Sequence, residues 1–162
     1  MKPTPTFAYA DDREDDLHLF KMAFDRAGLT NPLVLLHGSQ EVHAYLQGVE
    51  QFANRALYPL PSILFLDYKM PESNGIQLTR WVRARPQFKK VVILLFSGSG
   101  QQEDVETAYA AGVNAYIVKP QGMFRLSTVL QTVHSFWCDM ASLPHSIDDR
   151  PKRRSTTESF SP

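Results

Sequence analysis

The stretch ILFLDYKMPESNG, residues 63–75, places a carboxylate directly after a wholly apolar run. Residues 62–66 have the pattern of a buried strand, because strands covered on both faces of a parallel sheet are apolar without alternation. Asp67 follows at once, and Pro71 and Gly75 then mark a turn. In parallel sheets the working groups lie beyond the carboxyl ends of the strands. The stretch therefore predicts a parallel sheet with a polar site at the end of this strand.

The alternation of strand and helix extends along the chain. Four more apolar runs predict strands at 7–10, 32–38, 91–96 and 114–118. The helical spacing of apolar residues predicts helices at 17–24, 40–47, 75–84, 102–111 and 123–142. Five strands that alternate with helices imply right-handed crossovers and helices on both faces of the sheet. The expected fold class is α/β, a doubly wound five-stranded parallel sheet with (βα)5 order.

The composition is that of one globular domain with a tail. The chain has 162 residues, of which 43% are hydrophobic and 21% are charged, and these values suit a single core. We expect residues 1–143 to form the domain. Residues 144–162 have few apolar side chains, three prolines and mixed charge, so we expect them to form a disordered tail.

The charge and the cysteine content narrow the classes of function. The formal net charge is zero, which favours neither a nucleic-acid partner nor an anionic membrane. No apolar run reaches the length of a membrane span, and the N-terminus lacks the apolar segment of a signal peptide. The single cysteine, Cys138, allows no internal disulfide and suits a reducing compartment. We therefore expect a cytoplasmic protein.

Polar residues follow four of the predicted strands and would gather at one edge of the sheet. They are Asp11, Asp12, Asp67, Ser97 and Lys119. Two carboxylates about 4 Å apart repel each other by about 4 kcal/mol at an effective dielectric constant of about 20, and a hard divalent cation, most simply Mg²⁺, would relieve this repulsion. Lys119 adds a fixed positive charge and Ser97 a hydroxyl group, which together suit a phosphoryl group. Asp67 is then the candidate nucleophile.

Five motifs occur in a characteristic order. They are an acidic pair, the pattern LDYKMPESNG, a hydroxyl residue, an aromatic residue and a Lys-Pro pair, at Asp11–Asp12, 66–75, Ser97, Tyr116 and Lys119–Pro120. In this order and strand context they resemble the receiver domain of two-component response regulators, which has a flavodoxin-like fold, over roughly residues 6–142. The segments DDREDDLHLFKMAFDRAG, AYLQG, RALYPLPSILFLD and SFW are similar to the single-domain regulators related to the cyanobacterial phytochrome response regulator.

The resemblance implies a phosphoacceptor of a phosphorelay, and not an enzyme that turns over a substrate. A histidine kinase, phytochrome-like or hybrid, would donate its phosphoryl group to Asp67. Asp12, Asp67 and the backbone carbonyl of Lys69 would hold Mg²⁺. Asp11 would contact the ion through water or help to position it.

The resemblance also implies a conformational switch. Lys119 would pair with the phosphoryl oxygens, and Ser97 would swing inward to bond one of them. Tyr116 would follow Ser97 from an exposed to a buried rotamer. The added charge of the phosphoryl group would thus shift the equilibrium between these two conformations. The readout surface, which is also a candidate homodimer face, would comprise the helix 102–111, the strand 114–118 and the helix 123–142.

Other interpretations of the same residues stay open. A pseudo-receiver would bind partners without phosphorylation, although the intact set of site residues argues against one. A phosphohydrolase with an aspartate nucleophile requires a second acid two residues later, where this chain has Lys69. Asp11 and Asp12 would also suit the start of the first helix. The apolar cluster at 136–140 has the spacing of core residues, and part of it is alternatively a homodimer face.

Overall fold

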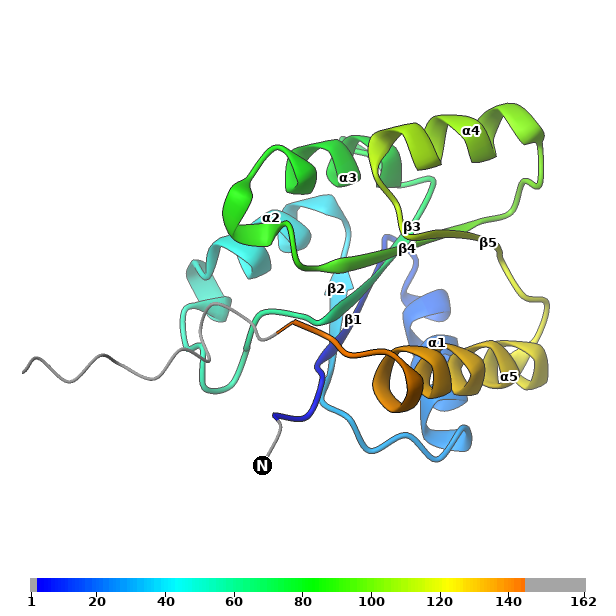
Figure 1. Ribbon diagram of the computed structural model, residues 1–162, viewed down its shortest axis with the longest axis horizontal. Helices are drawn as coiled ribbons and strands as arrows, with labels where there is room; N and C mark the ends of the chain where they lie inside the picture. The colour runs from blue at the N-terminus through cyan, green and yellow to red at the C-terminus, as the bar shows by residue number, and fades with distance from the viewer. Residues whose placement is uncertain (1–2, 145–162) are drawn as a thin grey trace, which may run out of the picture.

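The computed structural model describes residues 3–144 and arranges five strands of this range in one sheet (Figure 1). The strands are β1 (Phe7–Asp11), β2 (Leu33–His37), β3 (Ile63–Asp67), β4 (Val92–Ser97) and β5 (Ala115–Val118). The α-helices are α1 (Glu14–Arg26), α2 (Ser39–Gln47), α3 (Gly75–Arg83), α4 (Gln102–Ala111) and α5 (Met123–His134). Shorter helical segments are Glu50–Phe52, Pro86–Phe88 and Ser135–Met140.

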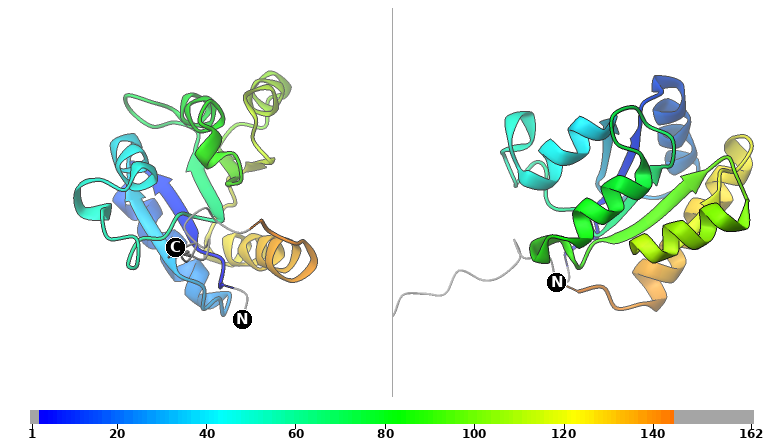
Figure 2. Two further views of the ribbon diagram at one scale, coloured as in Figure 1. Left: turned by 60° about the vertical axis from the view of Figure 1, so that its left-hand side comes forward. Right: turned by 90° about the horizontal axis from the view of Figure 1, so that it is seen from above.

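The sheet order is β2-β1-β3-β4-β5, and every neighbouring pair of strands is parallel. The helices α2, α3 and α4 cover one face, and α1 and α5 cover the other, as Figures 1 and 2 show from different sides. The expected doubly wound five-stranded α/β fold is therefore confirmed.

Two groups of buried side chains fill the spaces between the sheet and its helices. Successive residues of a strand point to opposite faces, so β1 contributes Ala8 and Ala10 to the group under α2, α3 and α4. Phe7 and Tyr9 join the group under α1 and α5, where the Tyr9 ring stacks on Phe20 with ring centroids 4.1 Å apart. The aromatic packing holds Tyr9 rigidly beside the carboxyl end of β1.

The strands β3 and β4 each extend one residue beyond the apolar pattern. Asp67 pairs with Phe96 in the sheet, and Ser97 pairs with Val118. The ladder of backbone hydrogen bonds, and not the polarity of the side chain, sets the end of each strand. Both polar residues consequently have the fixed backbone of a regular strand.

The long helix predicted at 123–142 is wrong in its length. The α-helix ends at His134, and Ser135–Met140 continues as a π-helical turn. The row of residues that faces the sheet is Leu126, Leu130 and Val133, at the spacing of successive helical turns.

The core interpretation of the apolar cluster at 136–140 is wrong for Phe136 and Met140. Phe124, Phe136 and Met140 are 66%, 50% and 77% exposed, whereas Trp137 is half-buried. Phe124 lies off the row that faces the sheet, and the Arg26 guanidinium lies 4.0 Å above its ring. The wider π-helical turn changes which side chains face inward, and α-helical spacing does not anticipate this change.

The described residues contain no helix that is long and apolar enough to cross a membrane. Of the tail predicted at 144–162, all residues except Pro144 lie outside the described range. The boundary predicted between domain and tail therefore stays a prediction.

Candidate functional site

Four strand ends meet at one edge of the sheet. Asp11, Asp67 and Ser97 are the last residues of β1, β3 and β4, and Lys119 follows β5 directly. Because the strands are all parallel, their carboxyl ends share this edge. The neighbouring strands β1 and β3 lead to α1 and α3, which lie on opposite faces of the sheet. The loops that follow the two strands therefore diverge at this edge.

Asp11, Asp12 and Asp67 form a compact acidic group at this edge. One carboxylate oxygen of each lies within 4.8 Å of the others. Asp11 and Asp67 are buried and Asp12 is half-buried. Burial, followed by the negative charge of Asp11, raises the pKa of Asp67 to about 6. Three crowded oxygen donors whose repulsion an ion would relieve fit a hard divalent cation.

Lys119 is the cation at the centre of the site. Its Nζ donates to Asp11 Oδ2 at 2.9 Å, to Asp16 Oδ2 at 3.2 Å and to Asp67 Oδ1 at 3.2 Å. Burial lowers the pKa of Lys119, but the hydrogen bond to Asp11 and the charges of Asp67 and Asp11 outweigh it and raise the pKa above its ordinary value. Lys119 is therefore a permanent positive charge beside Asp67.

Asp11 is held by protein groups on both of its oxygens. Its Oδ2 accepts the Tyr9 hydroxyl at 2.5 Å as well as Lys119, and its Oδ1 accepts the Arg13 backbone N–H at 2.9 Å. Burial, followed by the charge of Asp11, raises the pKa of Tyr9 far above its ordinary value, so its hydroxyl stays a donor. The contact lies just before α1, whose N-cap residue is Arg13 and has no side-chain cap, so the interpretation of Asp11 and Asp12 as helix caps is wrong.

Ser97 is bonded to the loop that leads to α4. Its Oγ accepts the backbone N–H of Ser99 at 3.1 Å. The Ser99 hydroxyl in turn donates to Asp104 Oδ2 at 2.8 Å, in the first turn of α4. The hydroxyl that was predicted at the site is therefore tied to the position of α4.

Tyr116 contacts the same loop from β5. Its hydroxyl donates to the Ser99 backbone carbonyl at 2.5 Å, and its ring packs against the buried group under α2, α3 and α4. Tyr116 is half-buried. The Tyr116 ring is thus turned toward the loop that follows Ser97.

The loop between β3 and α3 is fixed to the start of α2. The Ser39 hydroxyl donates to the Pro71 carbonyl at 3.2 Å, and Gln40 Nε2 donates to the Glu72 carboxylate at 2.8 and 3.0 Å. Glu72 has a φ of 67°, which is unusual for a residue with a side chain and needs such support. Lys69 lies in this loop, with an exposed side chain.

Gly75 lies against the backbone of Asp67. A Cβ at this position would be 2.3 Å from Leu95 Cδ1 and 2.8 Å from the Asp67 carbonyl oxygen. We therefore expect Gly75→Ala to lower the free energy of unfolding by about 1–3 kcal/mol, because the backbone that carries Asp67 must shift. Urea denaturation followed by circular dichroism measures the change. Gly98→Ala is the matched control, since a Cβ there meets nothing within 4 Å, and equal losses in the two variants would contradict the expectation.

The sequence did not indicate three residues that the structure brings into the site. Tyr9 stands two residues before Asp11, and the period of two in a strand was the signal that both share a face. Asp16 was one of three acids in the first turn of α1, with nothing to single it out. Ser99 is a loop residue whose three hydrogen-bonding groups are recognisable only in the fold.

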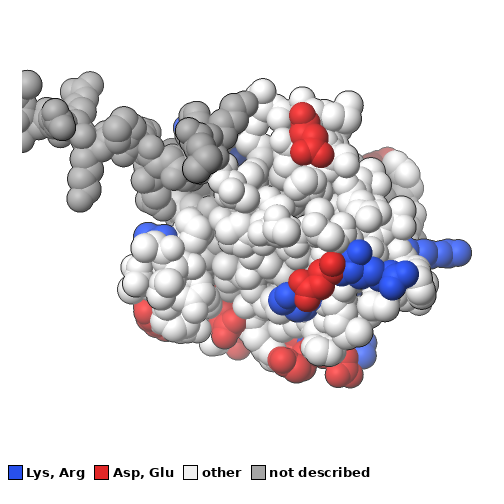
Figure 3. Space-filling model, turned by 90° about the horizontal axis from the view of Figure 1, so that it is seen from below, with Lys and Arg blue, Asp and Glu red and all other residues white. Residues whose placement is uncertain are grey.

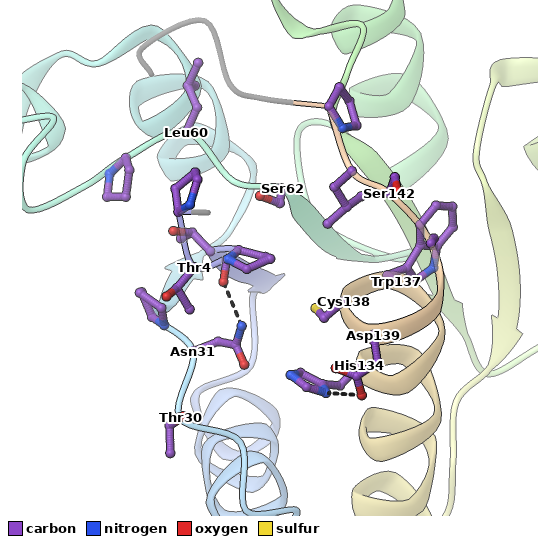
Figure 4. Close-up of a pocket in the computed structure, with 18 residues that line it drawn as sticks. Thr4, Thr30, Asn31, Leu60, Ser62, His134, Trp137, Cys138, Asp139 and Ser142 are labelled. Atoms are coloured by element: carbon purple, nitrogen blue, oxygen red, sulfur yellow. Dashed lines mark hydrogen bonds and ion pairs between the residues drawn. The ribbon is translucent and has the colours of Figure 1, made fainter. Parts of the chain in front are cut away.

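A separate hollow in the described part of the molecule lies away from this edge. It has a volume of about 700 Å³, and Figure 4 shows it between the segments that precede the strands and residues 134–144 at and after the end of α5. Thr6, Pro32 and Ser62, which precede β1, β2 and β3, line it together with Trp137 and Cys138. The hollow is therefore at the amino edge of the sheet, opposite Asp67.

Comparisons with known proteins agree with the geometry. Response regulator Rcp1 of Synechocystis sp. is 23% identical over 142 residues, which cover 88% of this chain and 95% of Rcp1, and its Mn²⁺-bound structure superposes with a TM-score of 0.75. The response regulator RPA3017 in red light signalling of R. palustris has 30% identity and a TM-score of 0.82, over 88% of this chain and 99% of that one. The phosphorylated cyanobacterial phytochrome response regulator RcpA has 23% identity and a TM-score of 0.78, over 88% and 100%.

The model of one protein family matches most of the chain. It is described as the response regulator receiver domain and matches residues 10–131. This range includes Asp11, Asp12, Asp67, Ser97 and Lys119. The fold, the acidic edge and the family match together show that the chain belongs to the response regulator receiver domains of two-component signalling.

Proposed function

We propose that Asp67 accepts a phosphoryl group from a histidine kinase in a Mg²⁺-dependent reaction, and that the chain signals by changing a partner-binding surface. The observation that carries the proposal is the surroundings of Asp67. This buried carboxylate lies within 4.8 Å of two others and 3.2 Å from Lys119 Nζ. Before a cation binds, the negative charges of this site outnumber the positive charge of Lys119. Once a cation is bound, the cation and Lys119 together can stabilise phosphoryl oxygens.

In the reaction, an oxygen of Asp67 attacks the phosphorus atom. The phosphorus–nitrogen bond to the kinase histidine breaks, and the imidazole nitrogen keeps the bonding pair. Asp12, Asp67 and the Lys69 carbonyl would hold Mg²⁺, which neutralises charge on the transferring group when it is bound. Asp11 would act on the ion through water, because both of its oxygens already accept hydrogen bonds.

Lys119 donates a charge-assisted hydrogen bond to the new phosphoryl oxygens, since one of its N–H groups already faces Asp67. Ser97 then turns to donate its hydroxyl to a phosphoryl oxygen and gives up the hydrogen bond that its Oγ accepts from the Ser99 N–H. This exchange releases the loop that Tyr116 and α4 contact through Ser99. The chain therefore acts as a switch that binds partners, and its only chemistry is its own phosphorylation and dephosphorylation.

The surface formed by α4, β5 and α5 is the proposed readout surface and homodimer face. Exposed Tyr109, Val118 and Phe124 lie on these three elements. The names of the relatives refer to phytochrome and to red light signalling, which supports a phytochrome-like or hybrid histidine kinase as the partner.

The proposal assigns residues 1–143 to the receiver domain and 144–162 to a tail, in a cytoplasmic protein without nucleic-acid or membrane partners. The face that α1 and α5 cover carries charges of both signs side by side, without a continuous basic area (Figure 3). An even mixture of charges provides no electrostatic footprint for nucleic acid.

The test is phosphoryl uptake measured by intact mass. The wild type, incubated with Mg²⁺ and a small-molecule phosphodonor, is expected to gain one phosphoryl group, and a chelator should abolish the gain. Asp67→Asn is expected to gain none, whereas the control Asp25→Asn, on the exposed part of α1, should behave as the wild type does. If the folded wild type takes up no phosphoryl group, the chain acts as a pseudo-receiver that binds partners without this chemistry.

A further inference from the structure

We propose that Asp16 is a positioning residue that holds Lys119 at rest and competes with the phosphoryl group for it. The inference rests on the proposed function, because it concerns how readily the phosphorylated state forms. Asp16 contributes no oxygen to the acidic group of the described residues that could hold a metal ion, which consists of Asp11, Asp12 and Asp67.

Each N–H donor of the Lys119 ammonium group already has a carboxylate acceptor. A lysine ammonium has three N–H donors, and here three carboxylates accept them, from Asp11, Asp16 and Asp67. If a phosphoryl group on Asp67 is to receive more than the one N–H that already faces this residue, another carboxylate must release Lys119. The same release lets the ammonium move toward the phosphoryl oxygens.

Asp16 is the carboxylate that releases Lys119 most readily. Asp11 is fully buried and is fixed by Tyr9 and by the Arg13 N–H. Asp16 has a side chain that is 22% exposed, so water can replace the ammonium. In addition, Arg13 Nε lies 3.7 Å from the same oxygen, Asp16 Oδ2, and can take over as its partner.

The consequence is a resting interaction that opposes activation. The Asp16 carboxylate neutralises part of the charge of Lys119 from the side of α1. An asparagine in its place keeps the shape and an acceptor oxygen but removes the charge, so Lys119 turns to the phosphoryl group at lower cost.

The experiment measures binding of beryllofluoride, a mimic of the phosphoryl group on aspartate, by titration calorimetry at saturating Mg²⁺. Asp16→Asn is expected to bind about fivefold more tightly than the wild type, as loss of a competing, partly exposed ion pair of about 1 kcal/mol predicts. Asp15→Asn is the matched control, because it removes the same charge one residue earlier, from an exposed side chain. Asp16→Glu restores the carboxylate and should return the affinity toward that of the wild type.

The outcomes separate this inference from the proposed function. If the wild type binds no beryllofluoride, the phosphoacceptor proposal itself fails. If the wild type binds it and Asp16→Asn matches Asp15→Asn, or binds more weakly than the wild type, only the role of Asp16 is refuted. Mg²⁺ affinity is the second readout, and it should change less than about threefold in Asp16→Asn, since Asp16 lies outside the acidic group.

Discussion

Asp67→Asn is expected to raise the free energy of unfolding of the metal-free protein by about 3 kcal/mol above pH 7. The folded state raises the pKa of Asp67 from 3.8 to about 6, through burial and then through the charge of Asp11. A group with a raised pKa binds more protons in the folded than in the unfolded protein, so stability falls as the pH rises through this interval. The ionised Asp67 therefore lowers the free energy of unfolding, and the uncharged amide of asparagine removes this destabilisation.

The pH dependence provides the internal control for this expectation. At about pH 4, close to the ordinary pKa of 3.8, Asp67 is protonated in the folded state and partly protonated in the unfolded state, so the difference between the two proteins should fall below about 1 kcal/mol. Urea denaturation at pH 4 and at pH 7.5, with a chelator present, measures both values. Added Mg²⁺ should narrow the difference at pH 7.5, because the ion stabilises the wild type more than the variant. A variant that is no more stable than the wild type at pH 7.5 would refute the electrostatic cost.

Lys119→Met is expected to have the opposite effect, a loss of about 3 kcal/mol in the metal-free protein at pH 7.5. Removing one partner of a buried ion pair leaves an uncompensated charge, which typically costs 3–5 kcal/mol. Asp11 is fully buried, whereas Lys119 is 27% exposed, so the lower end of this range applies. The same urea denaturation measures this loss.

Two further variants test whether the loss arises from the unpaired carboxylates. Lys21→Met removes an even shorter ion pair, with Asp25 at 2.6 Å, but both of these side chains are exposed, and the expected loss is below about 1 kcal/mol. In the double variant Lys119→Met/Asp67→Asn, the amide should add more stability than the about 3 kcal/mol that it adds to the wild type, because an Asp67 carboxylate without Lys119 is more costly. Additive effects of the two substitutions would mean that Lys119 and Asp67 do not interact.

The sequence was sufficient for the framework of the site. Apolar runs that end in Asp67, Ser97 and Lys119 predicted both the parallel sheet and the edge where these residues meet. The reason is physical: a strand buried on both faces has few alternatives to an apolar run, and parallel strands bring their carboxyl ends together. The ion pairs of Lys119 with Asp11 and Asp67 confirm that these residues meet.

The sequence was insufficient where several residues of one kind competed for a role. Glu14, Asp15 and Asp16 are successive acids of one helical turn, and only the angle at which α1 leaves β1 decides which of them reaches Lys119. Similarly, the apolar residues of the last helix do not reveal which side faces the sheet. The apolar cluster at 136–140 was for this reason expected in the core, although Phe136 and Met140 are exposed.

The contacts of Ser99 determine which substitutions related sequences can accept at the positions around it. Its N–H, carbonyl and hydroxyl contact β4, β5 and α4 respectively, through Ser97, Tyr116 and Asp104. The two backbone contacts tolerate any side chain, but the contact with Asp104 requires a short hydroxyl. Among related sequences, positions 99 and 104 should consequently change together. Positions 97 and 116 should change independently of the side chain at 99.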